Sequence, residues 1–341
     1  MNLDASGQPA HALPRTLRPA RRAAFLGLLS LAAAIVLNAA PAPETNAPAA
    51  PRIPGLFARS NLVAWCIVPF DAKRRGPEER AAMLERIGLR QLAYDYRAEH
   101  IPSFDAEVEA LRRHGIRLFA WWFPGELNDE ARIILALLER QQERGVQLWV
   151  TGGGDPPNTP EEHQARIASE AARLRPIAEA GARIGSVVGL YNHGGWFGEP
   201  NHQIAIIKHL RASAITNVGI VYNLHHGHDH LLQFPALLDR MKPYLVALNL
   251  NGMTLEGDRR GQKILPLGQG DLDLGLLRVV RNSGWSGPVG ILNHTDADAE
   301  ARLLDNLEGL DWLVGQLEGK PAGPKPTPRT WKPPAAPNAT P

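Results

Sequence analysis

Apolar residues between positions 58 and 320 follow two alternating patterns. Short runs rich in Val, Ile, Leu and aromatic residues alternate with longer stretches in which apolar residues recur at helical spacing. The short runs predict buried strands at 61–70, 90–96, 116–123, 146–151, 186–192, 218–223, 245–251 and 287–293. The longer stretches predict helices at 78–88, 103–115, 128–145, 161–185, 201–213, 230–244, 271–284 and 299–319.

This alternation of strand and helix predicts a (β/α)8 TIM barrel, an α/β fold, as a single domain. The competing interpretation is an open doubly wound sheet. It fits less well because no glycine-rich phosphate-binding sequence follows the first strand. In a barrel the chemistry lies at the carboxyl ends of the strands, and this rule selects candidate residues without any motif.

The two ends of the chain lack this periodicity. Arginines within 15–22 precede an apolar run at 23–40, and small and Pro residues follow, which is the pattern of a secretory signal. The run is also nearly long enough to span a bilayer, so residues 1–42 are predicted to be a signal peptide or an N-terminal membrane anchor. Residues 43–57 are predicted to be a Pro/Ala-rich linker, 58–320 the barrel, and 321–341 a Pro-rich disordered tail.

The barrel is therefore expected outside the cytoplasm, periplasmic or secreted, with a membrane contact only if the N-terminal segment is uncleaved. Lys and Arg number 37 and Asp and Glu 35, so the net charge of +2 gives no reason to expect a nucleic acid as partner. The single cysteine excludes an internal disulfide framework and a Cys-rich zinc site.

The carboxyl ends of the predicted strands carry many polar residues. The candidate catalytic acids and bases among them are Asp95, Glu99, Glu199 and His193. The candidate substrate-binding residues, which could hold a polyol, are Tyr191, Asn192, Trp196, Asn223, Asn249, Asn251 and Asn293.

Trp196, in a glycine-rich loop, has two interpretations. Its ring either stacks on the apolar face of a sugar at the rim of a pocket or anchors the loop. Histidines also gather here, with a run HHGHDH at 225–230, and imidazole is the commonest metal ligand. Neighbouring side chains of an extended stretch point in opposite directions, so at most two of these four histidines could converge on one ion.

The segment 60–318 resembles the xylose isomerase-like TIM barrels, which include sugar phosphate isomerases and epimerases and apurinic-endonuclease-type barrels. The resemblance rests on the order of the units and on the sequences VGLYNH (188–193), VGIVYNLHHGH (218–228), LPLGQGDLDL (265–274) and GPVGILNHT (287–295). It implies a divalent metal ion (Mn, Zn or Mg) held by Glu, Asp, His and Glu on the last four strands. Those positions here are Tyr191, Asn223, Asn249 and Asn293, so the resemblance implies that the usual ligands are replaced by neutral groups.

Two accessory histidines of the family pattern are retained, His193 and His226. A shift of one or two residues in the alignment of the last strand brings His294 into the ligand position. A non-standard metal site is therefore expected to use His226 and His294.

Two functions follow. The first is an exported isomerase or epimerase that acts on a sugar or sugar derivative by proton transfer next to a carbonyl. Such a reaction needs a base near the carbon and positive charge or hydrogen-bond donors near the oxygen, for which Arg97, a protonated histidine or the Asn amides are candidates. The second is a non-catalytic carbohydrate-binding barrel that kept the pocket and lost the metal site.

Overall fold

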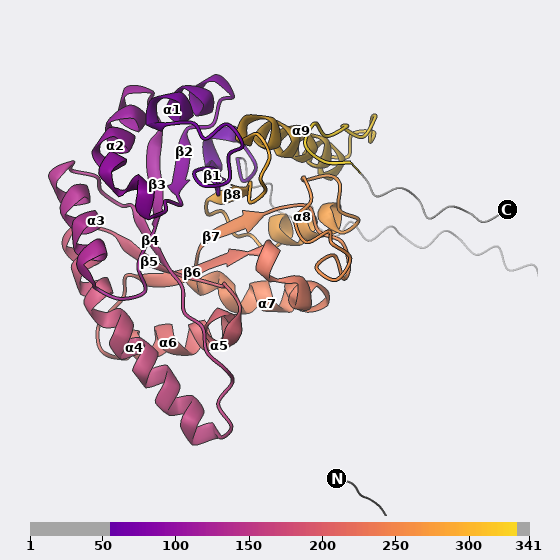
Figure 1. The fold of residues 1–341 in the computed structure, drawn as a ribbon. Coiled ribbons are helices and arrows are strands. Elements are labelled where there is room, and N and C mark those ends of the chain that lie inside the picture. Colours follow the sequence, from indigo (N-terminus) through magenta and orange to yellow (C-terminus); the bar gives the residue numbers. More distant parts are fainter. Residues whose placement is uncertain (1–54, 333–341) are drawn as a thin grey trace, which may run out of the picture. The chain divides into compact units, whose positions relative to one another are not determined.

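Eight parallel strands close into a barrel in the order β1-β2-β3-β4-β5-β6-β7-β8, and helices surround it (Figure 1). The computed structural model describes residues 55–332, so the predicted signal peptide or anchor and nearly all of the predicted linker lie outside the described residues. The closed order of the strands confirms the predicted (β/α)8 TIM barrel. Within 55–332 no helix is long and apolar enough to cross a membrane.

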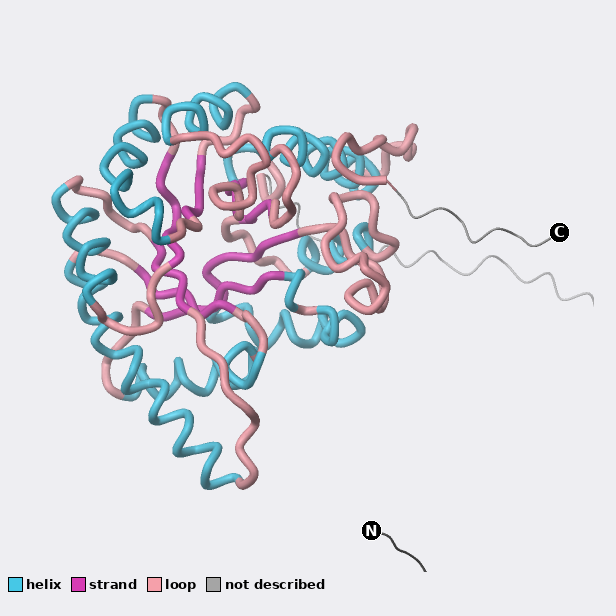
Figure 2. The backbone as a smooth tube through the Cα atoms, in the orientation of Figure 1, coloured by secondary structure: helices cyan, strands magenta, loops and turns pink. Residues whose placement is uncertain are grey.

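The strands are β1 (Leu62–Trp65), β2 (Gln91–Tyr94), β3 (Arg117–Trp122), β4 (Gln147–Val150), β5 (Val187–Tyr191), β6 (Val218–Asn223), β7 (Leu245–Leu250) and β8 (Val289–Leu292). The α-helices are α1 (Pro77–Arg86), α2 (Phe104–Arg113), α3 (Asp129–Arg140), α4 (Pro160–Arg183), α5 (Gly195–Gly198), α6 (Pro200–Ala212), α7 (Phe234–Met241), α8 (Asp273–Asn282) and α9 (Ala299–Leu317). Short 3-10 helices are η1 (Arg59–Asn61), η2 (Ala98–Ser103), η3 (Leu224–His226), η4 (His228–Gln233) and η5 (Lys242–Tyr244). Figure 2 shows the strands enclosed by this outer layer of helices.

The first strand is shorter than the predicted 61–70 and ends at Trp65. The next residue, Cys66, has a φ of 59°, which lies in the left-handed region and cannot continue an extended strand. The chain therefore turns at Cys66, and the residues after it form a loop over the carboxyl end of the barrel.

Side chains on each strand alternate between the barrel interior and the layer under the helices. Trp65, Trp149 and Tyr191 belong to the interior cluster, where the Trp65 ring centroid lies 4.7 Å from that of Trp149 and 5.8 Å from that of Tyr191. Trp121 faces outward and packs against Phe104 of α2, with 4.8 Å between ring centroids. The interior rings fill the barrel, so any cavity must lie above them, at the carboxyl ends of the strands.

A buried ion-pair network joins the loop after β1 to the start of α9. Both Asp71 carboxylate oxygens accept hydrogen bonds from the Arg75 guanidinium at 2.8 and 2.9 Å, and one also accepts from the Ala299 N–H at 3.1 Å. Arg75 in turn contacts Asp298 at 2.8 Å and Glu300 at 3.1 Å. This network holds the loops after β1 and β8 together.

The first part of the C-terminal tail contacts the barrel. Residues 321–332 form no helix or strand, but the Arg329 and Thr330 N–H groups donate to the buried Asp305 carboxylate at 2.9 Å. The side-chain amide of Gln269 donates to the Pro326 carbonyl at 3.0 Å. These contacts hold the described part of the segment predicted to be a Pro-rich disordered tail against α9, because the buried Asp305 carboxylate offers a partner to its backbone N–H groups.

We expect Asp71→Asn to lower the free energy of unfolding at pH 7 by about 2 kcal/mol, because Arg75 keeps Asp298 and Glu300 as partners but an amide cannot replace the charged hydrogen bonds that Asp71 accepts. Asp71 is 5% exposed. Urea unfolding followed by circular dichroism measures the change. The matched control is Asp311→Asn, since Asp311 forms an exposed pair with Arg59 and such pairs contribute less than about 1 kcal/mol.

The difference should depend on pH. Burial opposes ionisation of the Asp71 carboxyl, but hydrogen bonds from Ala299 and Arg75 outweigh it and lower the pKa. The stabilisation is therefore fully present above the pKa of an unfolded Asp, about 3.9, and is lost as the pH falls through the lowered folded value. Equal losses for the two variants at pH 7 would contradict this account.

Candidate functional site

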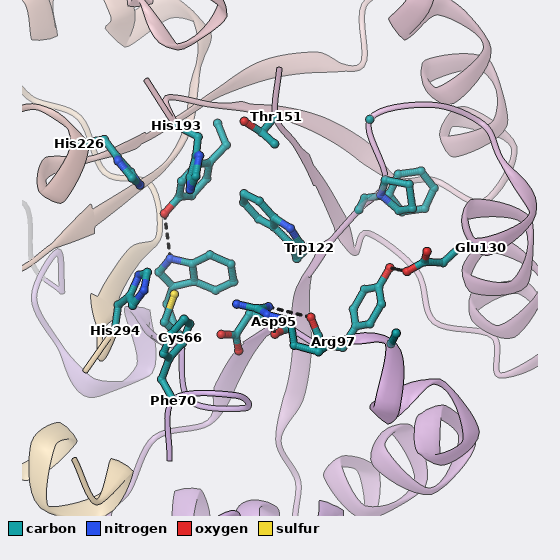
Figure 3. Close-up of a pocket in the computed structure, with 17 residues that line it drawn as sticks. Cys66, Phe70, Asp95, Arg97, Trp122, Glu130, Thr151, His193, His226 and His294 are labelled. Atoms are coloured by element: carbon teal, nitrogen blue, oxygen red, sulfur yellow. Dashed lines mark hydrogen bonds between the residues drawn. The ribbon is translucent and has the colours of Figure 1, made fainter. Parts of the chain in front are cut away.

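A cavity of about 490 Å³ opens at the carboxyl ends of the strands (Figure 3). Loops after β1 and β2 and the end of β3 supply most of its lining, and the loops after β5, β6 and β8 each add a histidine. Its lining includes Cys66, Phe70, Asp95, Tyr96, Arg97, Trp122, Glu130, Thr151, Tyr191, His193, His226 and His294. The volume lies within the range of small-molecule sites, about 300–1,000 Å³.

Asp95 is the buried carboxyl of this cavity and is 2% exposed. It follows β2, and its Oδ1 accepts a hydrogen bond from the Val68 N–H at 3.2 Å. Its Oδ2 has no hydrogen-bond partner among residues 55–332. Burial raises the pKa of the Asp95 carboxyl to about 7, against the opposing effects of the Val68 N–H and the Arg97 charge. Asp95 can therefore exchange a proton near neutral pH.

Arg97 brings a permanent positive charge to the same cavity. Its Nη1 donates to the carbonyls of Asp95 at 3.0 Å and Tyr96 at 2.8 Å, which fixes the guanidinium without a carboxylate partner among the described residues. The guanidinium carbon lies 5.3 Å from the centroid of the Phe70 ring, and the His294 ring centroid lies 3.9 Å from the same ring. Phe70 thus has contacts with both Arg97 and His294.

Cys66 lies beside Asp95 in this cavity. Its pKa is raised well above the usual value by burial and by the neighbouring Asp95 charge, so the sulfur is held as a thiol. The left-handed backbone that ends β1 also gives Cys66 its place in the cavity lining.

Histidines form one side of the cavity. The ring centroids of His193 and His226 lie 4.5 Å apart, and His225, behind them, lies 3.8 Å from His226 and 5.3 Å from His294. Burial lowers the pKa of every one of these four imidazoles, that of His226 to about 3. The four rings are therefore neutral in the unliganded protein at pH 7.

Three of the four positions that correspond to the metal ligands of the family, Tyr191, Asn223 and Asn249, form a neutral buried floor. The Trp65 indole N–H donates to the Tyr191 hydroxyl at 2.9 Å, and the Asn223 side-chain amide donates to the same hydroxyl. Asn249 pairs with Asn223 across β6 and β7. A Cβ at position 290 would collide with the Asn249 carboxamide, so the glycine of β8 makes room for it.

Asn293 does not join this floor. Leu292 belongs to the interior cluster, and alternation places the next side chain on the opposite side of the strand. Asn293 is fully buried, and its side-chain amide has no hydrogen-bond partner among residues 55–332. His294, one residue further, returns to the interior side and lines the cavity. On this strand His294, and not Asn293, therefore faces the cavity.

These residues do not fit the metal site that the family resemblance implies. Tyr191, Asn223 and Asn249 offer neutral oxygens that are weak donors to Mg²⁺, Mn²⁺ or Zn²⁺. His226 and His294 reach the same cavity, but within 55–332 no group of three or more His, Cys, Asp or Glu side chains could hold a metal ion. We therefore assign no metal to this donor set.

Other predicted site residues lie off the cavity. Glu99 is exposed on η2, and Glu199 precedes α6 with its carboxylate 3.2 Å from His230. Asn192 is buried, and its side chain binds the backbone of Asn223, accepting from its N–H at 2.7 Å and donating to its carbonyl at 3.1 Å. Glu99 and Glu199 are thus not placed as bases, and Asn192 joins β5 to β6.

Trp196 and Asn251 have structural contacts. Trp196 is 2% exposed, donates to His163 at 3.2 Å and stacks on His202 with 4.5 Å between ring centroids. It anchors its loop, so the interpretation as a sugar-stacking ring is wrong. Asn251 donates to the carbonyls of Gly252 at 2.9 Å and Lys263 at 3.4 Å in the loop after β7.

The predicted site residues did not include Trp122, Tyr96 or Glu130, which also line the cavity. Trp122 lies with its ring centroid 5.1 Å from Tyr191 and 5.8 Å from His193, and Tyr96 donates to Glu130 at the opposite side. Alternation along β3 was the available signal for Trp122, since Trp121 and Trp122 must face opposite sides. Nothing in the sequence marked Glu130, because it comes from the first turn of a helix.

Comparisons with known proteins agree with this fold. The chain is similar to the 3-keto-D-glucoside 4-epimerase YcjR from E. coli, at 16% identity and a TM-score of 0.53 over 75% of this chain and 99% of that one. It is also similar to the IOLI protein with a bound zinc atom, at 15% identity and a TM-score of 0.57 over 75% and 98%. A third is the probable 3-DHS dehydratase AsbF from Bacillus anthracis, at 12% identity and a TM-score of 0.56 over 74% and 98%.

At these identities the likeness shows the fold alone. No curated protein matches the chain in sequence. The sequence profile of the xylose isomerase-like TIM barrel family matches residues 67–314, which is most of the chain. The chain therefore belongs to the xylose isomerase-like TIM barrel family.

Proposed function

We propose that this protein is an isomerase or epimerase that transfers a proton next to the carbonyl of a sugar or sugar derivative, with Asp95 as the base. The observation that carries the proposal is the Asp95 carboxyl, buried in the cavity with one oxygen free of protein hydrogen bonds within 55–332. A base with a pKa near the working pH is the type that general base catalysis requires.

In this reaction the ionised Asp95 carboxylate accepts the proton from the carbon next to the carbonyl. The electron pair of the broken C–H bond moves toward the carbonyl oxygen, which becomes the oxyanion of an enediolate. Arg97 and the neutral imidazole N–H groups that line the cavity are the donors available to this oxygen. Asp95 then returns the proton to the neighbouring carbon, the former carbonyl carbon, while the hydroxyl proton on the first carbon moves to the oxyanion. The first carbon becomes the new carbonyl, the product is an isomer, and Asp95 is again a carboxylate.

The rest of the cavity suits a polyol. Trp122, Phe70 and Tyr96 present aromatic surface, on which the apolar face of a sugar ring can stack, and Thr151 and Glu130 present oxygens. Two proteins of similar fold are named as a keto-sugar epimerase and a dehydratase, which places such chemistry among barrels of this shape. The reaction as written needs no metal ion, which the residues at the ligand positions do not fit.

Asp95→Asn should abolish the reaction, with a loss of at least about 100-fold, because the amide cannot accept the proton. The measurement is deuterium incorporation by NMR after incubation of aldohexoses, 2-ketohexoses and hexuronates with the enzyme in D2O. Glu99→Gln is the matched control, because Glu99 is exposed and off the cavity, and it should keep full activity.

The same carboxyl sets the pH dependence. Because Asp95 must be ionised to act, kcat/KM should rise with pH and level off above about 7. Its raised pKa destabilises the folded protein above the pKa of an unfolded Asp, so Asp95→Asn should not lower the melting temperature at pH 8. If Asp95→Asn has a lower melting temperature than the wild-type chain at pH 8, its lost activity would be explained by misfolding and not by loss of the base.

The alternative function is a carbohydrate-binding barrel without catalysis. Tyr191, which lines the cavity, favours it, since its hydroxyl accepts hydrogen bonds from Trp65 and Asn223 and can still donate one to a ligand without reacting. Tight sugar binding to the wild-type chain, with no deuterium incorporated in D2O, would establish this alternative and exclude the enzyme.

Removal of divalent ions should leave the activity unchanged. Dialysis against EDTA, followed by elemental analysis and by reloading with Mn²⁺, Zn²⁺ or Mg²⁺, tests this directly. We expect less than one ion per chain and equal rates before and after reloading, because no three His, Cys, Asp or Glu side chains within 55–332 are placed to hold one ion. The proposed mechanism would be contradicted if the wild-type chain held one ion per chain and His226→Ala lost both this ion and the activity.

We also propose that the protein works outside the cytoplasm. The support is the basic stretch at 15–22 followed by the apolar run at 23–40, which lies outside the described residues. In a bacterial host the full chain should be found in the periplasmic or membrane fraction, and a chain lacking residues 1–42 in the cytosol. Carbonate washing of the membranes separates a cleaved signal from an anchor, and a full chain in the cytosol would refute export.

A further inference from the structure

Two positively charged residues, Arg97 and Lys263, lie near the neutral histidines of the cavity, with little negative charge to balance them. We call His193, His226, His294, Arg97 and Lys263 the imidazole rim. The three histidines line the cavity from the loops after β5, β6 and β8, and Figure 3 shows them on the side away from Glu130. Lys263 belongs to the loop after β7 that contacts the ring of His228, and its positive charge opposes protonation of His193, His226 and His294.

Lys263 is held in this place by its backbone. Its carbonyl accepts hydrogen bonds from the His228 ring at 3.0 Å and from the Asn251 amide at 3.4 Å, and Asn251 is buried. The Lys263 side chain is exposed and forms no ion pair within the described part of the chain. The loop after β7 thus carries an ammonium group that protein carboxylates leave free.

The acidic groups near the rim are few. Asp296 acts on His294, whereas Asp258 lies 3.9 Å from His228 and Glu199 lies 3.2 Å from His230, both outside the rim. Asp95 is the buried carboxyl that the proposed reaction uses, and Glu130 accepts the Tyr96 hydroxyl across the cavity. A negative group on a ligand would therefore meet two free cations and three imidazole rings here.

A carboxylate fits this rim better than a phosphate ester. A phosphate site in a barrel is commonly built from glycine-rich loops and a helix N-terminus. The glycines at 152–154 do not line the cavity, and Gly152 packs against Phe197 and Arg173 while Gly154 packs against Arg166. A carboxylate carries one delocalised negative charge, which the neutral imidazoles and the two cations of the imidazole rim can bind.

We infer that the imidazole rim binds the carboxylate of an acidic sugar, such as a hexuronate or an aldonate, and thereby sets the substrate class of the barrel. This inference rests on the proposed function only for the reaction that the bound ligand undergoes. Binding itself can be measured without turnover. The carboxylate lies against His193, His226 and His294, with Lys263 supplying the opposite charge, while the polyol carbons extend toward Asp95 and Arg97.

Isothermal titration of the full chain with four probes tests the inference: glucuronate, gluconate, glucose and glucose 6-phosphate. At pH 7 we expect the two sugar acids to bind about tenfold more tightly than glucose, a difference typical of one favourable charged contact. Lys263→Met should weaken glucuronate binding about fivefold and leave glucose unchanged. Lys208→Met, on the exposed face of α6, is the matched control and should change neither.

A second variant, His226→Gln, removes an imidazole that lines the cavity and should also weaken glucuronate more than glucose. Equal affinities for glucuronate and glucose would overturn the inference and leave the proposed function intact. Tighter binding of glucose 6-phosphate than of glucuronate would show that the imidazole rim binds a phosphate and not a carboxylate, and would overturn the inference. Glucuronate binding that depends on Lys263 but gives no deuterium incorporation in D2O would keep the inference and refute the proposed reaction.

Discussion

The seam between β1 and β8 is the constraint on which the rest of the structure depends. Four residue pairs join these strands, from Leu62 with Val289 to Trp65 with Leu292, and the Asn293 N–H donates to the Trp65 carbonyl at 2.9 Å. Once this seam closes, all eight carboxyl ends must meet around one opening. The Asp71–Arg75 network next to the seam then fixes the two loops that bring Phe70 and His294 to that opening.

Much of the fold was predictable because the relevant signals are local. Strand positions follow from short apolar runs, and helix ends follow from capping residues, so the barrel could be derived from sequence alone. The end of β1 could not, because a non-glycine residue in the left-handed region, Cys66, leaves no mark in an apolar run. The contacts of residues 321–332 were also hidden, since they depend on Asp305, a buried carboxylate far away in the sequence.

The site was predictable only in part, from the rule that the chemistry of a barrel lies at the carboxyl ends of its strands. That rule correctly placed Asp95, Tyr191, His193, His226 and His294 at the cavity. It could not tell a side chain that faces the cavity from one that turns into a loop, which is why Trp196 and Glu199 were misassigned. Orientation depends on hydrogen-bond partners contributed by other loops, such as His163 for Trp196 and His230 for Glu199, and no local pattern encodes these partners.

The position of Cys66 has a practical consequence for labelling. It is the single cysteine of the chain and lines the cavity beside Asp95, so any fluorophore, spin label or crosslinker attached through sulfur would occupy the space meant for a small molecule. Because burial keeps the sulfur protonated, such reagents should react slowly, and a bound ligand should slow them further. The rate of thiol modification therefore reports whether a ligand occupies the cavity. This measurement needs neither a chromogenic substrate nor knowledge of the product.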